Sequence, residues 1–253
     1  MTITTFARSE TTWFGDLIDN VKNCQNMYDV FDVILQEIRT LEFEDCVFGA
    51  SFAVPVTREN IIYLSSLPQN WQERYKKSQY ISFDPRIIHG RFSQTPLTWN
   101  DDKIDSKVLK KLSLKQQAMW GEMLDNQIRN GIAVSSRLQC GSGCMLIVSR
   151  QKQQISEKEC DVVIQRLDRI LQVGRIEFLK RHQSETGTAF VLTTKEKEVM
   201  RWTCDGKTSN DIGEILNIST DTVNFHIKNA IKKLSVPNKT AAAVTAFALG
   251  LLF

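Results

Sequence analysis

The chain has 253 residues, enough for two modest domains that each bury a hydrophobic core. Its formal net charge of +3 is too small for a protein that coats nucleic acid indiscriminately. No apolar run approaches the roughly 18 residues of a membrane span, and the start lacks the apolar core of a signal peptide. We therefore expect a cytoplasmic protein with reduced thiols and no membrane partner.

The first half of the chain predicts helices on either side of a short β-hairpin. Apolar residues recur at spacings of three and four through residues 13–41, which favours helix. Residues 46–54 and 60–66 are short and rich in β-formers, so we expect them to pair as a hairpin. Residues 105–130 again have a helical pattern.

A second hairpin and a long helix are predicted next. Residues 132–138 and 145–149 are rich in β-formers and flank Gly-Ser-Gly, a turn sequence. Ser156 and Glu159 have the spacing of a capping box, which opens a helix with an apolar face. Strands flanked by helices on both sides predict an α+β fold, here an α/β/α sandwich with an antiparallel sheet.

The six cysteines do not predict a metal or disulfide site. Cys140 and Cys144 are the only close pair, and no histidine lies near them in the sequence. Because Gly-Ser-Gly separates them, we interpret both as small core or strand residues beside a turn.

Residues 192–234 have the pattern of a helix-turn-helix. Thr193 and Glu196 form a capping-box spacing, so a helix should start there and end near Gly206. Thr208 should open a second helix, and Ser219 should cap a third after a short turn. With a closing helix, this predicts an all-α domain of four helices.

The third of these helices has two distinct faces. Apolar residues form one stripe, namely Val223, Ile227, Ala230, Ile231 and Leu234. Asn224, Lys228 and Lys232 line the opposite face, and residues 219–253 carry four lysines against one acid. Such a helix can enter a DNA major groove, although lysines on an ordinary solvated face give the same pattern.

The exact sequence favours DNA binding. Residues 193–199, 202–216 and 218–227 resemble the C-terminal domain of LuxR-type transcription regulators, and the similarity continues to Ala-Leu-Gly-Leu-Leu at the end. Departures are small: Lys195 stands where the family usually has Arg, and Asp-Ile-Gly replaces Glu-Ile-Ala.

The resemblance assigns roles to individual residues. It implies that Asn224 and Lys228 contact base edges, since Asn suits adenine and Lys suits guanine. Phosphate contacts are implied for Lys207, Thr208, Ser209 and Lys232. Thr222 belongs to the same DNA-binding surface, while His226 either contacts the DNA backbone or packs. Glu196 belongs to the fold, as a cap and an internal ion-pair partner.

A second motif lies between the hairpins. Trp71 and Tyr75 are four residues apart and share a face if their segment is helical. With Asp84 and Trp99 they offer aromatic walls and few polar groups, which suits an amphiphilic ligand. Taken singly, the tryptophans are as well explained as core residues, and Asp84 before Pro85 as a turn or cap.

The order and spacing resemble the autoinducer-binding domain of quorum-sensing LuxR-type receptors, closest to the orphan branch without a dedicated synthase. The matching positions are Trp71, Tyr75, Asp84, Pro85, Trp99 and Gly131. The resemblance implies an N-acyl homoserine lactone ligand. Asp84 would accept its amide N–H, the Trp71 indole would reach the lactone carbonyl, and Tyr75 would meet the amide carbonyl.

The remaining positions of this motif shape the pocket, and three departures keep a second ligand class open. Trp99 would pack beside the lactone ring, and Pro85 and Gly131 would shape the backbone. Leu67 stands where relatives often carry Tyr, Arg86 is unusual after Asp-Pro, and the strand at 145–148 lacks the serine of several relatives. The alternative is a sensor of the same architecture for a non-lactone small molecule.

The expected mechanism couples ligand to DNA. An empty pocket would leave Asp84, Tyr75 and the Trp71 N–H poorly satisfied, so that ligand completes the core. Residues 1–179 would bind ligand and dimerise, the polar residues 180–190 would be a linker, and residues 191–253 would bind DNA. We expect a homodimer on a near-palindromic operator, with RNA polymerase as a further candidate partner.

Two other classes of protein fit less well. A two-component response regulator needs a phosphoacceptor aspartate after a strand in a repeating β/α pattern, and residues 1–120 offer none. An enzyme would need a nucleophile with a base, or a glycine-rich phosphate motif. The three histidines are scattered, so we expect no catalytic residues, metal or cofactor.

Overall fold

The computed structural model describes residues 10–52, 60–93, 95–101, 103–104, 112–137, 142–185 and 191–253. The chain divides into two compact units. The first holds a sheet with helices α1–α6 as far as residue 182, and the second holds helices α7–α10. Several predicted features fall partly or wholly outside the described residues, namely the strand ends at 53–54 and 138, residues 105–111 of a predicted helix, Cys140 and Gly141 at the second turn, and residues 186–190 of the linker.

A six-stranded sheet forms the centre of the first unit, with strand order β2-β1-β6-β5-β3-β4. The strands are β1 (Asp45–Phe52), β2 (Asn60–Ser65), β3 (Leu97–Asn100), β4 (Lys103–Ile104), β5 (Asn130–Arg137) and β6 (Gly143–Arg150). Both predicted hairpins are confirmed as neighbouring strands, and β5 pairs with β6 antiparallel so that Ile132 lies opposite Val148.

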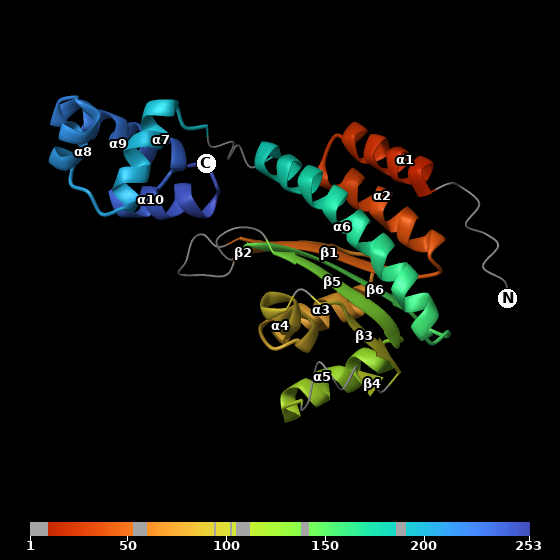
Figure 1. Cartoon of the computed structure of the whole chain (residues 1–253). Helices are drawn as coiled ribbons and strands as arrows, with labels where there is room; N and C mark the ends of the chain where they lie inside the picture. Colours follow the sequence, from red (N-terminus) through yellow and green to blue (C-terminus); the bar gives the residue numbers. More distant parts are fainter. Residues whose placement is uncertain are drawn as a thin grey trace. The chain divides into compact units, whose positions relative to one another are not determined.

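Helices cover both faces of this sheet (Figure 1). One layer contains α1 (Glu10–Asn23), α2 (Met27–Thr40) and α6 (Glu157–Glu185). The other contains α3 (Gln69–Lys77), α4 (Pro85–Phe92) and α5 (Leu114–Asp125), with the short 3-10 helix η1 (Tyr80–Ser82) between α3 and α4. The predicted α/β/α sandwich is confirmed.

The predicted helical segment at 13–41 is two helices rather than one. Asn26 caps α2: its side chain accepts the backbone N–H groups of Tyr28 and Asp29, and Asp29 accepts the Asn26 N–H in return. This reciprocal cap starts a new helix and leaves a break after Asn23. Burial of Val30 and the rest of its apolar face then packs α2 against the sheet.

Strand β3 was not predicted from the sequence, because it has only four residues. Its burial nevertheless alternates, with Leu97 and Trp99 buried and Thr98 and Asn100 half-buried. Antiparallel pairing with both β4 and β5 stabilises it. The helix predicted over 105–130 is shorter: Ser113 caps α5 at its start, and the helix ends at Asp125.

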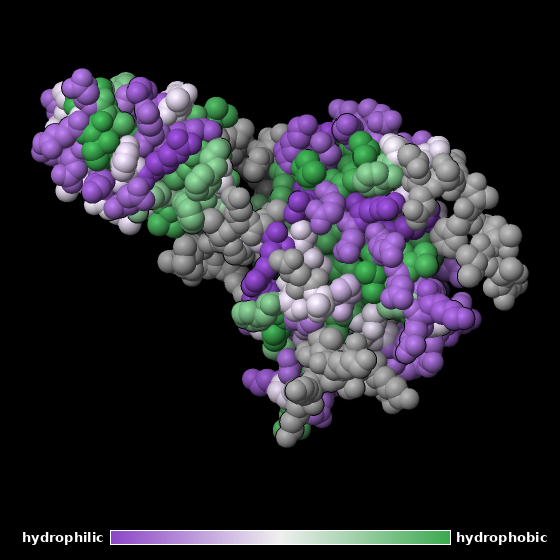
Figure 2. Space-filling model, viewed as in Figure 1, coloured by the Kyte–Doolittle hydropathy of each residue, from purple (hydrophilic) through white to green (hydrophobic). Residues whose placement is uncertain are grey.

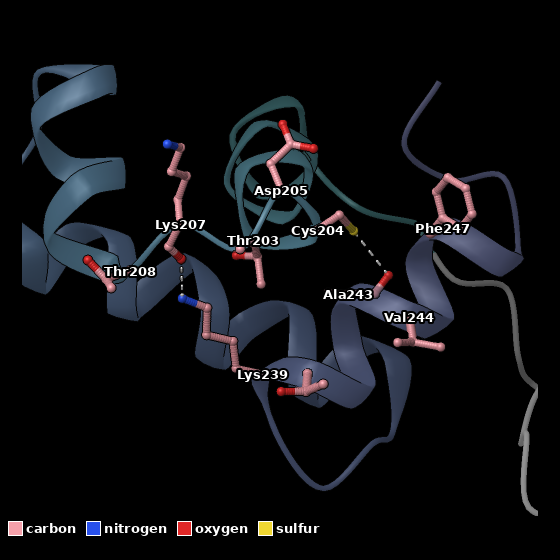
Figure 3. Close-up of a pocket in the computed structure, with 11 residues that line it drawn as sticks. Thr203, Cys204, Asp205, Lys207, Thr208, Lys239, Ala243, Val244 and Phe247 are labelled. Atoms are coloured by element: carbon pink, nitrogen blue, oxygen red, sulfur yellow. Dashed lines mark hydrogen bonds between the residues drawn. The ribbon is translucent and has the colours of Figure 1, made fainter.

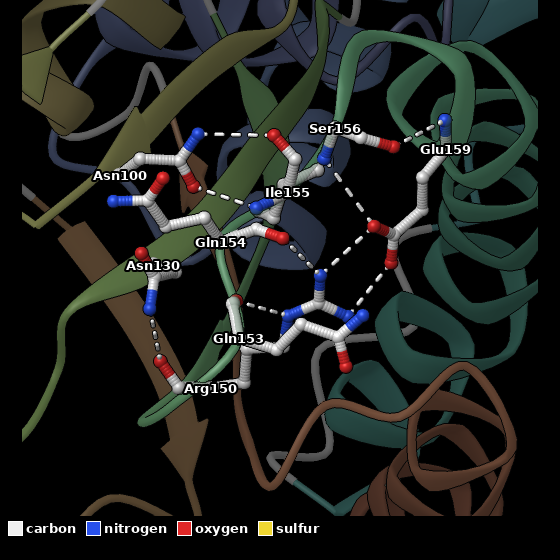
Figure 4. Close-up of polar contacts among 8 residues, drawn as sticks. All are labelled: Asn100, Asn130, Arg150, Gln153, Gln154, Ile155, Ser156 and Glu159. Carbon is white, nitrogen blue, oxygen red and sulfur yellow. Dashed lines mark hydrogen bonds and ion pairs between the residues drawn. The ribbon is translucent and has the colours of Figure 1, made fainter. Parts of the chain in front are cut away.

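Arg150, at the end of β6, ties the sheet to the start of α6 (Figure 4). Its guanidinium donates to both carboxylate oxygens of Glu159 at 2.7 and 2.9 Å and to the carbonyls of Gln153 and Gln154. Asn100 holds the same loop through two hydrogen bonds to the Ile155 backbone. The predicted Ser156–Glu159 cap is present within this network.

Helix α6 is 29 residues long and buries the apolar face predicted for it. The buried positions are Val163, Leu167, Ile170, Leu171 and Phe178. The helix continues to Glu185 and therefore includes the first part of the predicted linker at 180–190. No proline or glycine precedes Gly187 there, so the polar residues continue the helix. Residues 186–190 lie outside the described part.

The second unit is a four-helix arrangement, as predicted. Its helices are α7 (Thr194–Cys204), α8 (Ser209–Leu216), α9 (Thr220–Leu234) and α10 (Lys239–Ala248). Thr193, Thr208 and Ser219 each cap the helix that follows, and Gly206 has a φ of 80° after α7. Of the predicted α9 stripe, four residues are buried and Ile231 is half-buried.

Figure 2 shows hydrophilic residues spread over the visible face of both units, with groups of apolar residues between them. Apolar atoms normally contribute much of a folded protein's surface, so scattered groups need no partner. Among the described helices, none combines the length and apolar character needed to cross a bilayer. The described cysteines are free, and Cys144 is a buried strand residue, as predicted.

Candidate ligand site and DNA-binding surface

Trp71, Tyr75 and Trp99 meet in one aromatic cluster in the first unit. Trp71 and Tyr75 lie on α3 with ring centroids 6.0 Å apart, which confirms that they share a helix face. Trp99 comes from β3, and its ring centroid lies 6.0 Å from that of Trp120 on α5. Trp71, Trp99 and Trp120 are all buried. The cluster thus has the aromatic walls expected of an amphiphile site.

Asp84 is the polar centre of this region and is fully buried. Its Oδ1 accepts the backbone N–H of Arg86 at 2.9 Å, so Asp84 is the N-cap of α4, and Pro85 occupies the first helical turn. The Tyr75 hydroxyl donates to Oδ2 at 2.9 Å. Tyr75 and Asp84, to which the family resemblance gives separate contacts with the ligand, are therefore hydrogen-bonded to each other.

Arg86 folds back onto the same carboxylate. Its Nη2 lies 2.7 Å from Asp84 Oδ2, and its Nε lies 3.1 and 3.2 Å from the two oxygens. The side chains of Arg86 and Asp84 are 4% and 0% exposed, so water does not screen this pair. The guanidinium also lies over the Trp99 ring, 5.5 Å from its centroid.

Burial and charge determine how these groups ionise. Burial and the nearby Asp84 carboxylate raise the pKa of Tyr75 well above its usual range. Burial opposes the charge on Arg86, but the attraction of Asp84 outweighs it and raises the Arg86 pKa. Tyr75 therefore stays a neutral hydroxyl and Arg86 stays a cation at any ordinary pH.

An empty site was expected to leave Asp84, Tyr75 and the Trp71 N–H poorly satisfied. This was wrong for Asp84 and Tyr75, because Arg86 and Tyr75 supply the donors for Asp84. Trp71 Nε1 is likewise not among the buried atoms without a partner in the described residues. In the described part of the first unit, the buried side-chain nitrogens without a partner are instead Trp99 Nε1 and Trp120 Nε1. Each is an N–H donor, and a buried donor without an acceptor costs about 1–3 kcal/mol. What the two indole N–H groups lack is a hydrogen-bond acceptor.

Gly131 lies on β5 directly opposite Trp99. A Cβ at this position would overlap the Trp99 ring and the backbone oxygen of Val148. The absence of a side chain at Gly131 thus lets the Trp99 indole approach the β5 backbone closely. Leu67 is a buried member of the same cluster.

Sequence reasoning missed Arg86 and Trp120 as members of this site. Arg86 is an unusual residue after Asp-Pro, and its position two residues after the N-cap aspartate is a local signal from which the return contact could be predicted. Trp120 offered no signal beyond its residue type, because the antiparallel pairing of β3 and the start of α5 decide what it meets. Glu122 and Arg74 close the outer edge, where bonds from Arg74 and Tyr80 lower the Glu122 pKa to about 2.

The predicted DNA-binding residues lie on α8, α9 and the segment before α8. Asn217, with a φ of 53°, makes the tight turn between the two helices. Lys207, Thr208, Lys228 and Lys232 are exposed, and Ser209, Thr222, Asn224 and His226 are half-buried. Asn224 and Lys228 are one helical turn apart on the side of α9 away from buried Val223 and Ile227.

Glu196 has the structural role expected of it. It accepts the backbone N–H of Thr193 at 2.8 Å and the Lys233 ammonium at 2.7 Å, and its side chain is 3% exposed. Burial alone would raise its pKa, but the bonds from Lys233 and Thr193 outweigh this and lower the pKa. The ion pair joins the start of α7 to the end of α9.

A hollow of about 690 Å³ lies between the end of α7, the start of α8 and α10 (Figure 3). Lys239 donates to the Lys207 carbonyl at 3.1 Å across it, and Val244 and Phe247 line its apolar side. It belongs to the helix-turn-helix unit, and none of the predicted ligand residues lines it.

This architecture, a sandwich with a buried aromatic site and a separate helix-turn-helix unit, is that of a ligand-responsive transcription regulator. Residues 26–173 match the autoinducer binding domain, and residues 190–246 match the luxR family of bacterial regulatory proteins. The chain belongs to the LuxR family of quorum-sensing transcription regulators.

Individual relatives cover nearly the whole chain. The transcriptional activator protein AnoR of Acinetobacter nosocomialis is 32% identical over 95% of this chain and 99% of its own length. The quorum-sensing regulator RhlR of Pseudomonas aeruginosa is also 32% identical, over 95% of this chain and 96% of its own.

Solved structures of SdiA have the same fold. The crystal structure of Escherichia coli SdiA has a TM-score of 0.82 at 26% identity and covers 97% of this chain and 100% of SdiA. SdiA in complex with octanoyl-rac-glycerol has a TM-score of 0.77 at 27% identity and covers 100% of this chain and 98% of that one.

Proposed function

We propose that this protein binds an N-acyl homoserine lactone in its first unit and, as a homodimer, a near-palindromic DNA operator through α9. The observation that carries the proposal is the convergence of Trp71, Tyr75, Asp84 and Trp99 in one buried cluster within the autoinducer-binding match. Residues 1–179 would bind ligand and dimerise, and residues 191–253 would bind DNA. RNA polymerase is a further candidate partner.

The acyl chain supplies most of the binding free energy in this proposal, because each buried CH₂ contributes about 0.8 kcal/mol. The cluster includes Leu97, Met119, Met123 and Ile147 beside its aromatic rings, and these offer apolar contact to a flexible chain. Trp99 and Trp120 would donate to carbonyl oxygens of the head group.

DNA binding in this proposal rests on α9. Lys228 and Asn224 would read base edges, and Lys207, Thr208, Ser209 and Lys232 would hold phosphates, with Thr222 and His226 at the same surface. Two such helices in a dimer would reach half-sites about one helical turn apart.

A second candidate is a sensor of the same architecture for a non-lactone acyl compound. The Arg86–Asp84 pair favours it, because the Arg86 guanidinium already donates to the Asp84 carboxylate that the amide N–H of an N-acyl homoserine lactone would need as its acceptor. SdiA, which has this fold, has been solved with octanoyl-rac-glycerol, a compound without an amide.

Thermal unfolding of the full protein against lactones of increasing acyl length tests the proposal. We expect a concentration-dependent rise in melting temperature with the preferred chain, because ligand binds only the folded state. Asp84→Asn keeps an N-cap acceptor but removes the negative charge of the carboxylate, which is the acceptor expected for the amide N–H of the lactone. The rise in melting temperature should therefore be smaller for this variant. Asp101→Asn, at an exposed turn, is the matched control.

The two candidates give different results. A rise with lactones identifies the first. A protein that still binds DNA but shows no shift with any lactone, and a rise with monoacylglycerols, identifies the second.

A further inference from the structure

Asp84 has no acceptor position left for a ligand. An ionised carboxylate offers about four lone-pair sites. Four donors already point at it, namely the Arg86 backbone N–H, Arg86 Nε, Arg86 Nη2 and the Tyr75 hydroxyl, at 2.7–3.2 Å. A ligand N–H can reach Asp84 only if the guanidinium moves away.

Arg86 is held in this place by more than its partner. Its side chain is 4% exposed and lies over the Trp99 ring, which itself is fixed against Gly131. The pair is only two residues apart on one helix start, so its geometry does not depend on how distant elements pack. Moving the Arg86 guanidinium would separate two buried opposite charges that water does not screen, which is costly.

Among the described residues of this site, the buried side-chain groups that lack partners are donors. Trp99 Nε1 and Trp120 Nε1 are buried and unpaired, their rings contact each other, and the Arg86 guanidinium lies over one of them. An incoming head group would therefore be bound through its oxygens. An N–H on the same head group would have no acceptor at Asp84.

We propose that Arg86 is a specificity-determining residue that turns this site against amide head groups and toward acyl ligands whose head group carries carbonyl oxygens and no N–H, such as esters. The inference rests on the proposed function in placing an acyl ligand at this site, and it departs from the first candidate ligand at the amide N–H. Arg86 acts by holding Asp84, while Trp99 and Trp120 contact the ligand oxygens.

A matched pair of ligands tests this inference. N-octanoyl homoserine lactone and the octanoate ester of α-hydroxy-γ-butyrolactone differ only in the amide N–H, which the ester replaces by oxygen. We expect the wild-type protein to bind the ester at least as tightly as the amide. In Arg86→Ala the Asp84 carboxylate is free to accept the amide N–H of the ligand. The amide should then bind more tightly than the ester, by a factor of about ten or more.

Controls keep the result interpretable. Arg137→Ala removes an exposed arginine from β5 and should keep the wild-type preference. If Arg86→Ala fails to fold by circular dichroism, Arg86→Gln replaces the charge by a neutral amide with fewer donors, and its preference should shift the same way. The wild-type ratio is decisive even without either variant.

Each outcome has one meaning. A wild-type preference for the amide of tenfold or more overturns the inference and leaves the proposed function intact. Binding of the ester without the amide supports the inference and overturns the assignment of an N-acyl homoserine lactone as the ligand. If neither compound binds at any acyl length, both are overturned.

Discussion

Trp99 and Gly131 lie opposite each other on β3 and β5, and the indole ring of Trp99 covers the bare backbone of Gly131. The same ring also contacts Arg86 and Trp120. The pairing of β3 with β5 thus positions Trp99 in the aromatic site.

Gly131→Ala should destabilise the first unit, because the added methyl overlaps both the Trp99 ring and a backbone oxygen. Overpacking of this kind costs about 1–3 kcal/mol. Urea unfolding of the full chain measures the loss. Gly121→Ala is the matched control: nothing lies within 4 Å of its Cβ, and alanine in α5 should gain up to about 1 kcal/mol. Equal stability of the two variants would contradict the contact.

Arg150→Ala should destabilise the first unit strongly. The Arg150 side chain is 2% exposed and holds Glu159 and two carbonyls, and breaking such a buried pair costs about 3–5 kcal/mol. Chemical denaturation again provides the measurement. Arg129→Ala breaks an exposed pair with Asp101 and should change stability by less than about 1 kcal/mol. A small effect at Arg150 would show that the network in Figure 4 contributes little.

The Glu196–Lys233 pair should make the second unit less stable in acid. The folded state lowers the Glu196 pKa, so its contribution is present above the ordinary glutamate pKa of about 4.3 and is lost as the pH falls through the lower folded value. Calorimetry should show that the free energy of unfolding of the second unit differs between wild type and Glu196→Gln by about 1–2 kcal/mol at pH 7. This difference should shrink below pH ~4.

A control separates this pair from surface charge. Glu198→Gln removes a half-exposed partner of Lys195 and should leave the acid response unchanged. A gap between wild type and Glu196→Gln that stays constant from pH 7 to pH 3 would mean that ionisation of Glu196 is not the cause.

Lys228→Ala should weaken binding to the operator by about 1–3 kcal/mol and affect random duplex much less, if Lys228 contacts a base edge. Lys207→Ala, at an assigned phosphate contact, should weaken both by similar factors and reduce the salt dependence. Fluorescence anisotropy on the two duplexes measures this. Equal losses on both DNAs for Lys228→Ala would refute the base contact.

Local sequence signals predicted the second unit well. Its caps are short-range devices: Thr193 and Glu196 are three residues apart, and each bonds the other's backbone. The α9 stripe depends only on helical period, so its buried face could be predicted without knowing its partners. Even Glu196 was predicted as a structural residue.

Non-local contacts limited prediction in the first unit. Strand β3 is too short to have a reliable period, and its pairing with β5 involves residues about 30 positions away. Trp120 joins the site for the same reason. The division of 13–41 and the Arg86 contact were different, since Asn26 with Asp29, and Asp84 with Arg86, are local signals that could have been predicted.

The placement of the tryptophans gives this protein its own optical probes. Of its five tryptophans, Trp71, Trp99 and Trp120 belong to the aromatic cluster, and Trp202 packs against the core of the second unit. Trp13 donates to Glu37 and lies under Arg166 in the helical layer. A ligand that accepts from the Trp99 and Trp120 indoles would change their emission directly, while Trp202 reports on the DNA-binding unit, so binding can be followed without any attached dye.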